Sequence, residues 1–276
     1  GLFGAPAMGA AGAAVATIIA QGVSGILCLI YIIAKIPVLH LNRNDLHAGK
    51  DVYGIQLKIG LPMALQYSIT AIGSMMVQSS LNILGSTLVA AFTAAGKIEQ
   101  VVTQAYVAMG TTMATYSAQN MGAGSVKRIR EGFRANTIIG IIYSLVAAAF
   151  VMTVGKYMTY LFVSEDVDLI MNSVDIYLKC IGLFFIPLTV VNIYRNGIQG
   201  LGYGLLPMMA GVAELIGRGI VAVIAGNMRS YTGVCLAGPA AWVLAGGLLL
   251  VMYFYIMNVH MKKIFGTNGK DRKEAE

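Results

Sequence analysis

The chain has 276 residues, of which 57% are apolar and only 11% are charged. Soluble domains carry about 25% charged residues, so the composition excludes an ordinary water-soluble protein, a disordered chain and, with three cysteines, a disulfide-stapled fold. The net charge of +7 comes from short basic runs between apolar stretches, which is typical of membrane loops rather than of nucleic-acid binding.

Seven apolar stretches are long enough to cross a bilayer, because about 20 residues of helix span the hydrocarbon core. Their apolar runs are continuous, and an open sheet cannot satisfy its backbone hydrogen bonds in lipid, so helices are favoured over strands. The sequence therefore predicts an all-α integral membrane protein. The expected spans are residues 8–34, 59–83, 88–119, 135–155, 174–199, 207–227 and 235–260.

Lysine and arginine are distributed unequally between the two sides of these spans. Thirteen lie on one side: four in residues 35–58, four in 127–134 and five in the C-terminal tail, against Lys156 and Arg229 on the other side. The positive-inside rule places the basic side, and with it the C-terminus, in the cytoplasm.

A pattern of small residues that begins at Gly9 recurs 224 residues later, beginning at Gly233. The two segments are expected to run in the same direction with six spans between equivalent points, which is a parallel repeat of the kind that transporters contain. The following domains are expected: 1–35, the last helix of an N-terminal lobe; 36–58, a cytoplasmic linker; 59–260, a complete six-helix lobe; and 261–276, a cytoplasmic tail.

Prolines fall at or inside several spans. Pro62 and Pro207 are expected in the first turn of their helices, where proline costs little. Pro187 lies in the middle of the span 174–199 and should kink it. The kink could serve packing alone, or it could be a hinge for a moving helix.

Charged side chains inside spans are costly unless they are paired or face water, so each is a functional hypothesis. Glu214 and Arg218 have the i, i+4 spacing of an intrahelical ion pair, which predicts a structural role. Arg195 could reach Glu214, and Lys179 with Asp175 has the same pair spacing near the outer end of its helix.

The span 88–119 carries two polar stripes. Lys97 and Glu99 are two residues apart and cannot share one helix face. The first stripe contains Lys97, Gln100 and Gln104, and the second contains Glu99, Thr103 and Tyr106. At least one stripe is expected to line a hydrated cavity, where a carboxyl group such as Glu99 could exchange a proton or Na⁺ during transport.

Flexible methionine and aromatic walls suit varied apolar cations, although methionine is more often core filling. The residues expected to line a substrate cavity are Tyr67, Met75, Met76, Tyr106, Met109, Met113 and Tyr116.

Several short motifs follow one another along the chain. They are Gly60-Leu61-Pro62, residues 89–100 (VAAFTAAGKIEQ), 119–124 (QNMGAG) before a basic loop, 161–166 (LFVSED), and 197–202 (GIQGLG) followed by Pro207. Together they resemble, in the right order, the second half of the multidrug and toxic compound extrusion (MATE) transporters.

The resemblance implies a MATE-type bundle in which this chain supplies helices 6 to 12 of twelve: one complete six-helix lobe and the last helix of the preceding lobe. It implies a secondary antiporter of the bacterial inner membrane that exports cationic or amphipathic drugs or toxic metabolites in exchange for Na⁺ or H⁺. Its implied partners are the lipid bilayer, these small molecules and the N-terminal lobe of the same chain, without nucleic acid and without a cofactor beyond the coupling ion.

The chain departs from the pattern of NorM-like members, which carry acids where this chain has residues 67–70 (YSIT) and 187–189 (PLT). The arginine and Asp-Thr common after the tenth helix are Gln199 and residues 203–204 here. The second-lobe cation site of those relatives therefore does not carry over. Coupling is expected in the first lobe, as in DinF-like members, or at Glu99, and the sequence is closer to the MepA-like branch.

Three other functions compete with drug export. A lipid-linked saccharide flippase of the same superfamily would need a basic cavity for pyrophosphate, and only Lys97 and Arg195 are available. A seven-helix receptor or retinal protein is disfavoured because the last span has no lysine for a Schiff base. A membrane enzyme would need a catalytic cluster, and the sequence offers no Ser/His/Asp group or Cys/His metal spacing.

Overall fold

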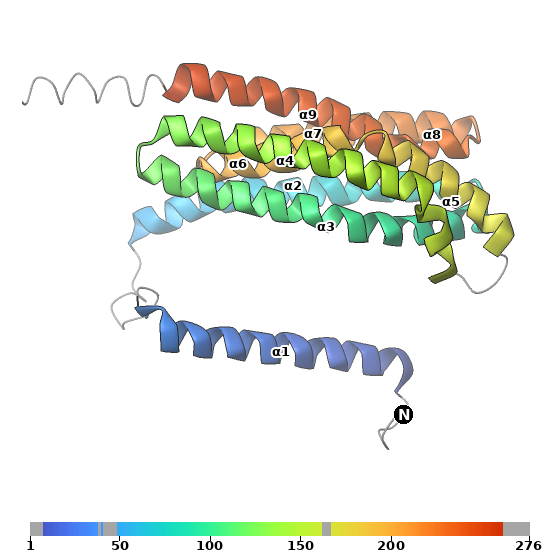
Figure 1. Ribbon diagram of the computed structural model, residues 1–276, viewed down its shortest axis with the longest axis horizontal. Helices are drawn as coiled ribbons and strands as arrows, with labels where there is room; N and C mark the ends of the chain where they lie inside the picture. Colours follow the sequence, from blue (N-terminus) through green and yellow to red (C-terminus); the bar gives the residue numbers. More distant parts are fainter. Residues whose placement is uncertain (1–7, 38–39, 41–48, 162–166, 262–276) are drawn as a thin grey trace, which may run out of the picture. The chain divides into compact units, whose positions relative to one another are not determined.

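The computed structural model describes residues 8–37, 40, 49–161 and 167–261, and every regular element within them is helical (Figure 1). The chain divides into two compact units, residues 1–54 and 55–276. The first unit contains α1 (Gly9–Lys35), an apolar helix of 27 residues. The second unit begins within α2 (Lys50–Asn82), four residues before the lobe expected from the sequence.

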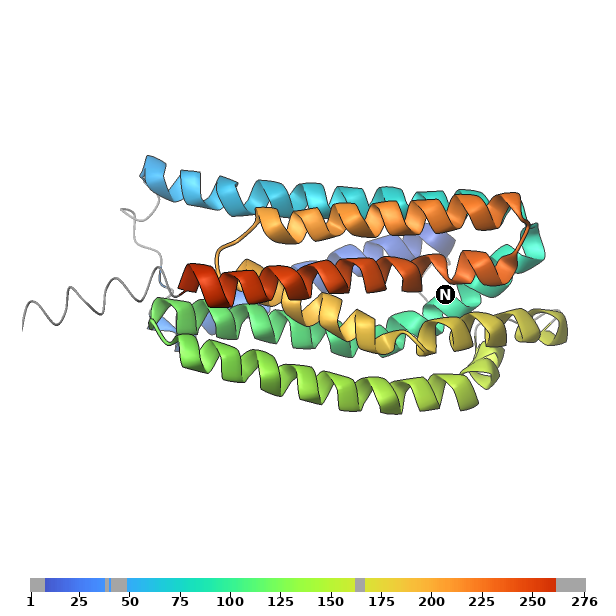
Figure 2. The same cartoon turned by 90° about the horizontal axis from the view of Figure 1, so that it is seen from above.

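The second unit is a bundle of long helices that run alongside one another (Figures 1 and 2). After α2, its elements are α3 (Ser86–Gly122), α4 (Val126–Thr153), the 3₁₀ helix η4 (Gly155–Leu161), α5 (Val167–Gly182), α6 (Phe185–Gly200), α7 (Leu205–Asn227), α8 (Tyr231–Cys235), α9 (Ala237–Tyr255) and the π-helical turn η5 (Ile256–His260). The predicted span 8–34 overlaps α1 of the first unit. Each of the other predicted spans overlaps one helix of the second unit or a broken pair, α5–α6 or α8–α9.

Hydropathy separates these helices into two groups. Four helices of the described residues are long and apolar enough to cross a membrane, or five when the bent pair α5–α6 counts as one span. Helices α2 and α3 have 33 and 37 residues but are too polar along their length for the same criterion. Their polar residues Ser74 and Glu99 line part of the candidate site described below, whose charged cluster lies on α6 and α7.

Two predicted boundaries were wrong because the helices extend beyond their apolar cores. Helix α2 begins at Lys50, inside the expected linker 36–58, so Pro62 lies well inside the helix rather than in its first turn. Proline cannot donate to the carbonyl four residues earlier. The turn at Gly204 approaches that carbonyl, of Lys58, so that an added methyl group at Gly204 would lie 3.2 Å from its oxygen. Helix α4 begins at Val126, so its first two turns carry the basic run ahead of the apolar span.

The kink expected at Pro187 is present but lies before the proline. Helices α5 and α6 meet at an angle of 53°, with the break at residues 183–184. Pro187 is the third residue of α6. It has no N–H for the carbonyl of Leu183, so the helix restarts at Phe185, where proline within the first turn is tolerated.

Helices α3, α4, α5, α6 and α9 enclose the main core. Tyr106, Phe133 and Phe185 are fully buried in it. The ring of Phe133 packs against Tyr194 and Tyr253, with centroids 5.2 and 4.6 Å away. Small residues allow close helix contacts: at Gly200, an added methyl group would collide with the backbone carbonyl of Ala114 on α3.

Candidate functional site

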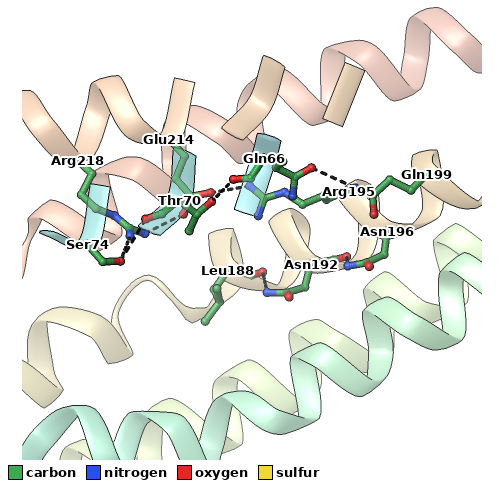
Figure 3. Close-up of polar contacts among 10 residues, drawn as sticks. All are labelled: Gln66, Thr70, Ser74, Leu188, Asn192, Arg195, Asn196, Gln199, Glu214 and Arg218. Atoms are coloured by element: carbon green, nitrogen blue, oxygen red, sulfur yellow. Dashed lines mark hydrogen bonds and ion pairs between the residues drawn. The ribbon is translucent and has the colours of Figure 1, made fainter. Parts of the chain in front are cut away.

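A buried cluster of three charges joins α6 to α7 (Figure 3). The two carboxylate oxygens of Glu214 accept separate ion-paired hydrogen bonds, from Arg195 at 2.6 Å and from Arg218 at 2.7 Å. The Glu214 side chain is 6% exposed, and the arginine side chains are 15% and 12% exposed. The predicted Glu214–Arg218 pair and the reach of Arg195 to Glu214 are therefore confirmed.

Helix α2 adds a polar face to this cluster. The Oγ of Ser74 accepts a hydrogen bond from the Arg218 guanidinium at 3.1 Å, and the Gln66 side chain accepts one from Gln199 at 3.0 Å (Figure 3). Gln66, Thr70 and Ser74 are spaced by four residues and so share one side of α2. The sequence analysis missed this face, although the same spacing could have revealed it.

Helix α2 lies along α7 in both views of the bundle (Figures 1 and 2). Glycines of α7 lie at this contact: Gly211 meets the Gln66 side chain, Gly219 meets Met76, and Gly226 meets Ser80. Further along, Val77 and Leu81 pack with Ala222 in a second small core. Small residues on α7 thus bring the polar face of α2 within hydrogen-bonding distance of the charged cluster.

A cavity of about 300 Å³, partly open to the surface, lies next to this cluster. Its wall includes Glu99 from α3, Tyr177 from α5 and Arg218 from α7. The Tyr177 hydroxyl donates a hydrogen bond to Oε2 of Glu99 at 2.5 Å. The rest of the wall is formed by Ser74, Val77, Gln78, Phe92, Ile181, Val234, Cys235, Gly238, Pro239 and Trp242.

The two polar stripes of α3 lie on different faces, as predicted. Glu99 and Thr103 are partly buried within the bundle, and Glu99 borders the cavity. Lys97, Gln100 and Gln104 are exposed on the surface of the second unit. The structure therefore separates the candidate coupling residues into one acid inside the lobe and one basic, amide-rich stripe outside it.

The residues expected to line a substrate cavity are not brought together. Tyr106 is fully buried and hydrogen-bonded to Ser144 at 3.2 Å, and Met113 is 2% exposed, so both belong to the core. Tyr67 and Met75 are about 70% exposed on α2, and Met76 packs at Gly219. Met109 and Tyr116 are partly buried against the main core.

The outer pair predicted on α5 is also present. Lys179 donates to Asp175 at 2.6 Å, with the lysine side chain 53% exposed. The aspartate side chain is 18% exposed, so the pair is only partly accessible. Pro187 lies outside the charged cluster, and its hinge role stays a prediction.

The comparisons with known proteins assign this bundle to a family. A family model described as MatE matches residues 61–224, which is more than half of the chain. The chain belongs to the MATE transporter family. Because the family consists of transporters, the expectation that the protein is not an enzyme holds at the level of the family.

Two curated MATE relatives illustrate the match. The chain is 33% identical over 192 residues to the probable multidrug resistance protein YpnP of Bacillus subtilis, covering 69% of this chain and 42% of that protein. It is 24% identical to the probable multidrug resistance protein NorM of Thermotoga maritima, covering 100% of this chain and 56% of that protein. The chain thus spans about half the length of the curated relatives it matches.

Solved MATE structures share the fold. A transporter of the MOP superfamily from Pyrococcus furiosus superimposes with a TM-score of 0.81 at 19% identity, over 90% of this chain and 57% of that one. A multidrug resistance MATE transporter in the outward-facing conformation gives 0.79 at 18% identity, over 91% and 56%. The predicted fold class, an all-α membrane bundle of the MATE type, is therefore confirmed.

Proposed function

We propose that this chain forms the C-terminal lobe, together with the last helix of the N-terminal lobe, of a two-lobe secondary antiporter. The transporter would export cationic or amphipathic drugs or toxic metabolites across the bacterial inner membrane in exchange for H⁺ or Na⁺. The observation that carries the proposal is the Glu99 carboxylate, which borders an internal cavity midway along a membrane-length helix.

The Glu99 carboxylate costs free energy at membrane depth, and a role in transport would explain its presence there. A carboxylate at membrane depth is unfavourable unless it is paired or in contact with water. Glu99 has one hydrogen bond from Tyr177 and borders open volume with its remaining surface. A cavity acid that gains and loses a coupling ion as the cavity opens to one side and then the other would link ion entry to substrate exit.

The exposed polar stripe of α3 supports the proposal that a second lobe faces this surface. Lys97, Gln100 and Gln104 are exposed on the second unit at mid-helix, where contact with lipid would leave polar groups unsatisfied. A water-filled path between two lobes would satisfy them. This stripe is therefore the surface proposed to face the substrate pathway, with the basic C-terminal side in the cytoplasm.

The flippase alternative is less well supported. Recognition of a pyrophosphate group needs unpaired basic side chains. The guanidinium in the cavity, Arg218, already pairs with Glu214, and Glu99 makes the same wall partly acidic. The two relatives described above are each named a probable multidrug resistance protein.

The test is Glu99→Gln in the complete two-lobe transporter, assayed by ethidium efflux from cells. Loss of efflux is expected because the amide cannot take up or release the coupling ion. The matched control is Glu131→Gln, which changes an exposed acid of α4 and should leave efflux unchanged. Wild-type efflux in Glu99→Gln, at equal expression, would reduce Glu99 to a structural residue.

A further inference from the structure

The first two turns of α4 carry a concentration of positive charge. Residues 126–134 contain four cations and one acid, which give a net charge of +3. Lys127, Arg130 and Arg134 follow one another at spacings of three and four residues, so they share one face of the helix. All three are exposed. We refer to these three residues as the basic patch.

The same face of α4 continues into the span as a row of apolar side chains. Ile138, Ile142 and Leu145 extend the spacing of three or four residues and are exposed. Every exposed residue from 138 to 150 is apolar, unlike the polar stripe of α3. Helix α4 runs along one edge of the second unit (Figure 2) and is apolar enough to cross a membrane. This row therefore suits contact with lipid acyl chains, and the basic patch lies where the row ends.

Contacts with the end of α9 hold the basic patch at the membrane boundary. Nη2 of Arg130 donates to the Met257 carbonyl at 2.9 Å and to Oδ1 of Asn258 at 3.4 Å. Both acceptors belong to η5, which directly follows the exposed aromatic residues Phe254 and Tyr255. Exposed aromatic side chains near a helix end are typical of the membrane interface. Arg130 is thus fixed at headgroup depth, and both contacts use one nitrogen of a group that has five N–H donors.

We propose that the basic patch and the apolar row together form a binding site for an anionic phospholipid. Side chains on a helix tilt toward its N-terminus, so Arg134 extends from the apolar row toward the headgroup layer. Arginine binds phosphate through paired hydrogen bonds, and Arg130 and Arg134 lie one turn apart. The headgroup phosphate lies between these two guanidinium groups, and an acyl chain follows the apolar row. The site goes beyond the proposed function, since lipid binding does not require export.

The charge arrangement favours a lipid site over a uniformly solvated basic surface. Lys127 and Glu131 are 4.0 Å apart with side chains 90% and 61% exposed, so this pair is weak and leaves the ammonium group accessible. Arg128 is exposed but lies about 120° around the helix from Arg134. A general positive field would use Arg128 as much as Arg134, whereas a site continuous with the apolar row uses Arg134 and Lys127.

The experiment measures lipid binding to the purified two-lobe transporter in a neutral detergent. Native mass spectrometry gives the affinity for phosphatidylglycerol, which is anionic, and for phosphatidylcholine with the same acyl chains, which is neutral overall. The wild type is expected to bind phosphatidylglycerol more tightly, and added salt should weaken this preference. Each cation near an anionic headgroup is worth about a fivefold change in affinity. Lys127→Gln combined with Arg134→Gln should therefore bind phosphatidylglycerol about 25-fold more weakly.

The matched control is Arg128→Gln, which removes the same charge from the same turn and should bind as the wild type. Arg134→Lys keeps the charge and should retain most of the affinity. Equal affinity of the wild type for both lipids would overturn the proposal, even when the double variant does not fold. Equal losses in Arg128→Gln and Arg134→Gln would also contradict it, because they indicate a general field. Displacement of phosphatidylglycerol by an equal concentration of soluble glycerol phosphate would show that the apolar row contributes nothing.

Discussion

The charged cluster at Glu214 allows a stability prediction that can be worked from its geometry. Glu214→Gln keeps the size of the side chain but removes the negative charge that both arginines share. Of the two guanidinium groups, 15% and 12% exposed, one could still donate to the amide oxygen, whereas the other would lose its acceptor and face the amide NH2 group. Breaking a buried ion pair from one side costs about 3–5 kcal/mol, because an uncompensated charge stays buried.

We therefore expect Glu214→Gln to lower the free energy of unfolding by about 3–5 kcal/mol. The measurement is thermal unfolding of the purified transporter in detergent, together with the yield of monodisperse protein. The matched control is Glu131→Gln, which breaks the exposed pair with Lys127, with side chains 61% and 90% exposed, and should cost less than about 1 kcal/mol. Adding Arg218→Gln to Glu214→Gln removes one stranded cation and should recover part of the loss.

Equal unfolding temperatures for Glu214→Gln and Glu131→Gln would refute this reasoning. They would mean that the cluster is hydrated in the working protein and contributes little to folding. A second outcome would change the role given to Glu214: unchanged stability of Glu214→Gln combined with altered ion dependence of efflux. It would assign Glu214 to coupling and leave Arg195 and Arg218 as parts of the ion path.

Three further predictions concern packing, access and motion. Gly200→Ala should destabilise the bundle by roughly 1–3 kcal/mol, because its methyl group meets the Ala114 carbonyl; unfolding temperature measures this, and an unchanged value would contradict the close contact. Lys97→Cys should react with a membrane-impermeant maleimide, whereas Ile98→Cys, at a fully buried position, should not. Equal labelling of the two cysteines would contradict the prediction that the Lys97 stripe faces water. Pro187→Ala should slow ethidium export without lowering the unfolding temperature, and the reverse result would assign Pro187 to packing alone.

Properties that depend on sequence neighbours could be predicted from the sequence. The spans follow from the length of each apolar run, and the pair Glu214–Arg218 follows from four-residue spacing on one helix. The bend near Pro187 was also predictable, because proline removes a backbone donor wherever the helix lies. The break could not be placed to the residue, since either side of the missing hydrogen bond can open.

Properties that depend on which helices meet could not be predicted. The Glu99 cavity needs Tyr177, 78 residues away, and the link from Gln66 to Gln199 crosses 133 residues. Helix periodicity correctly placed Tyr106 on the same face as Glu99. It gave no information on depth: that face borders a cavity at Glu99 but is packed against Ser144 two turns later.

The polarity of α2 and α3 connects these observations. A helix that faced lipid on every exposed side would gain nothing from Gln66, Ser74 or Lys97, because each polar group would have to be desolvated. In this bundle, Ser74 on the polar face of α2 accepts a hydrogen bond from Arg218, and the inner face of α3 presents Glu99 to the cavity. Two of the more polar helices, α2 and α3, therefore line part of the candidate site, although its charged cluster lies on α6 and on α7, which is apolar enough to span a membrane.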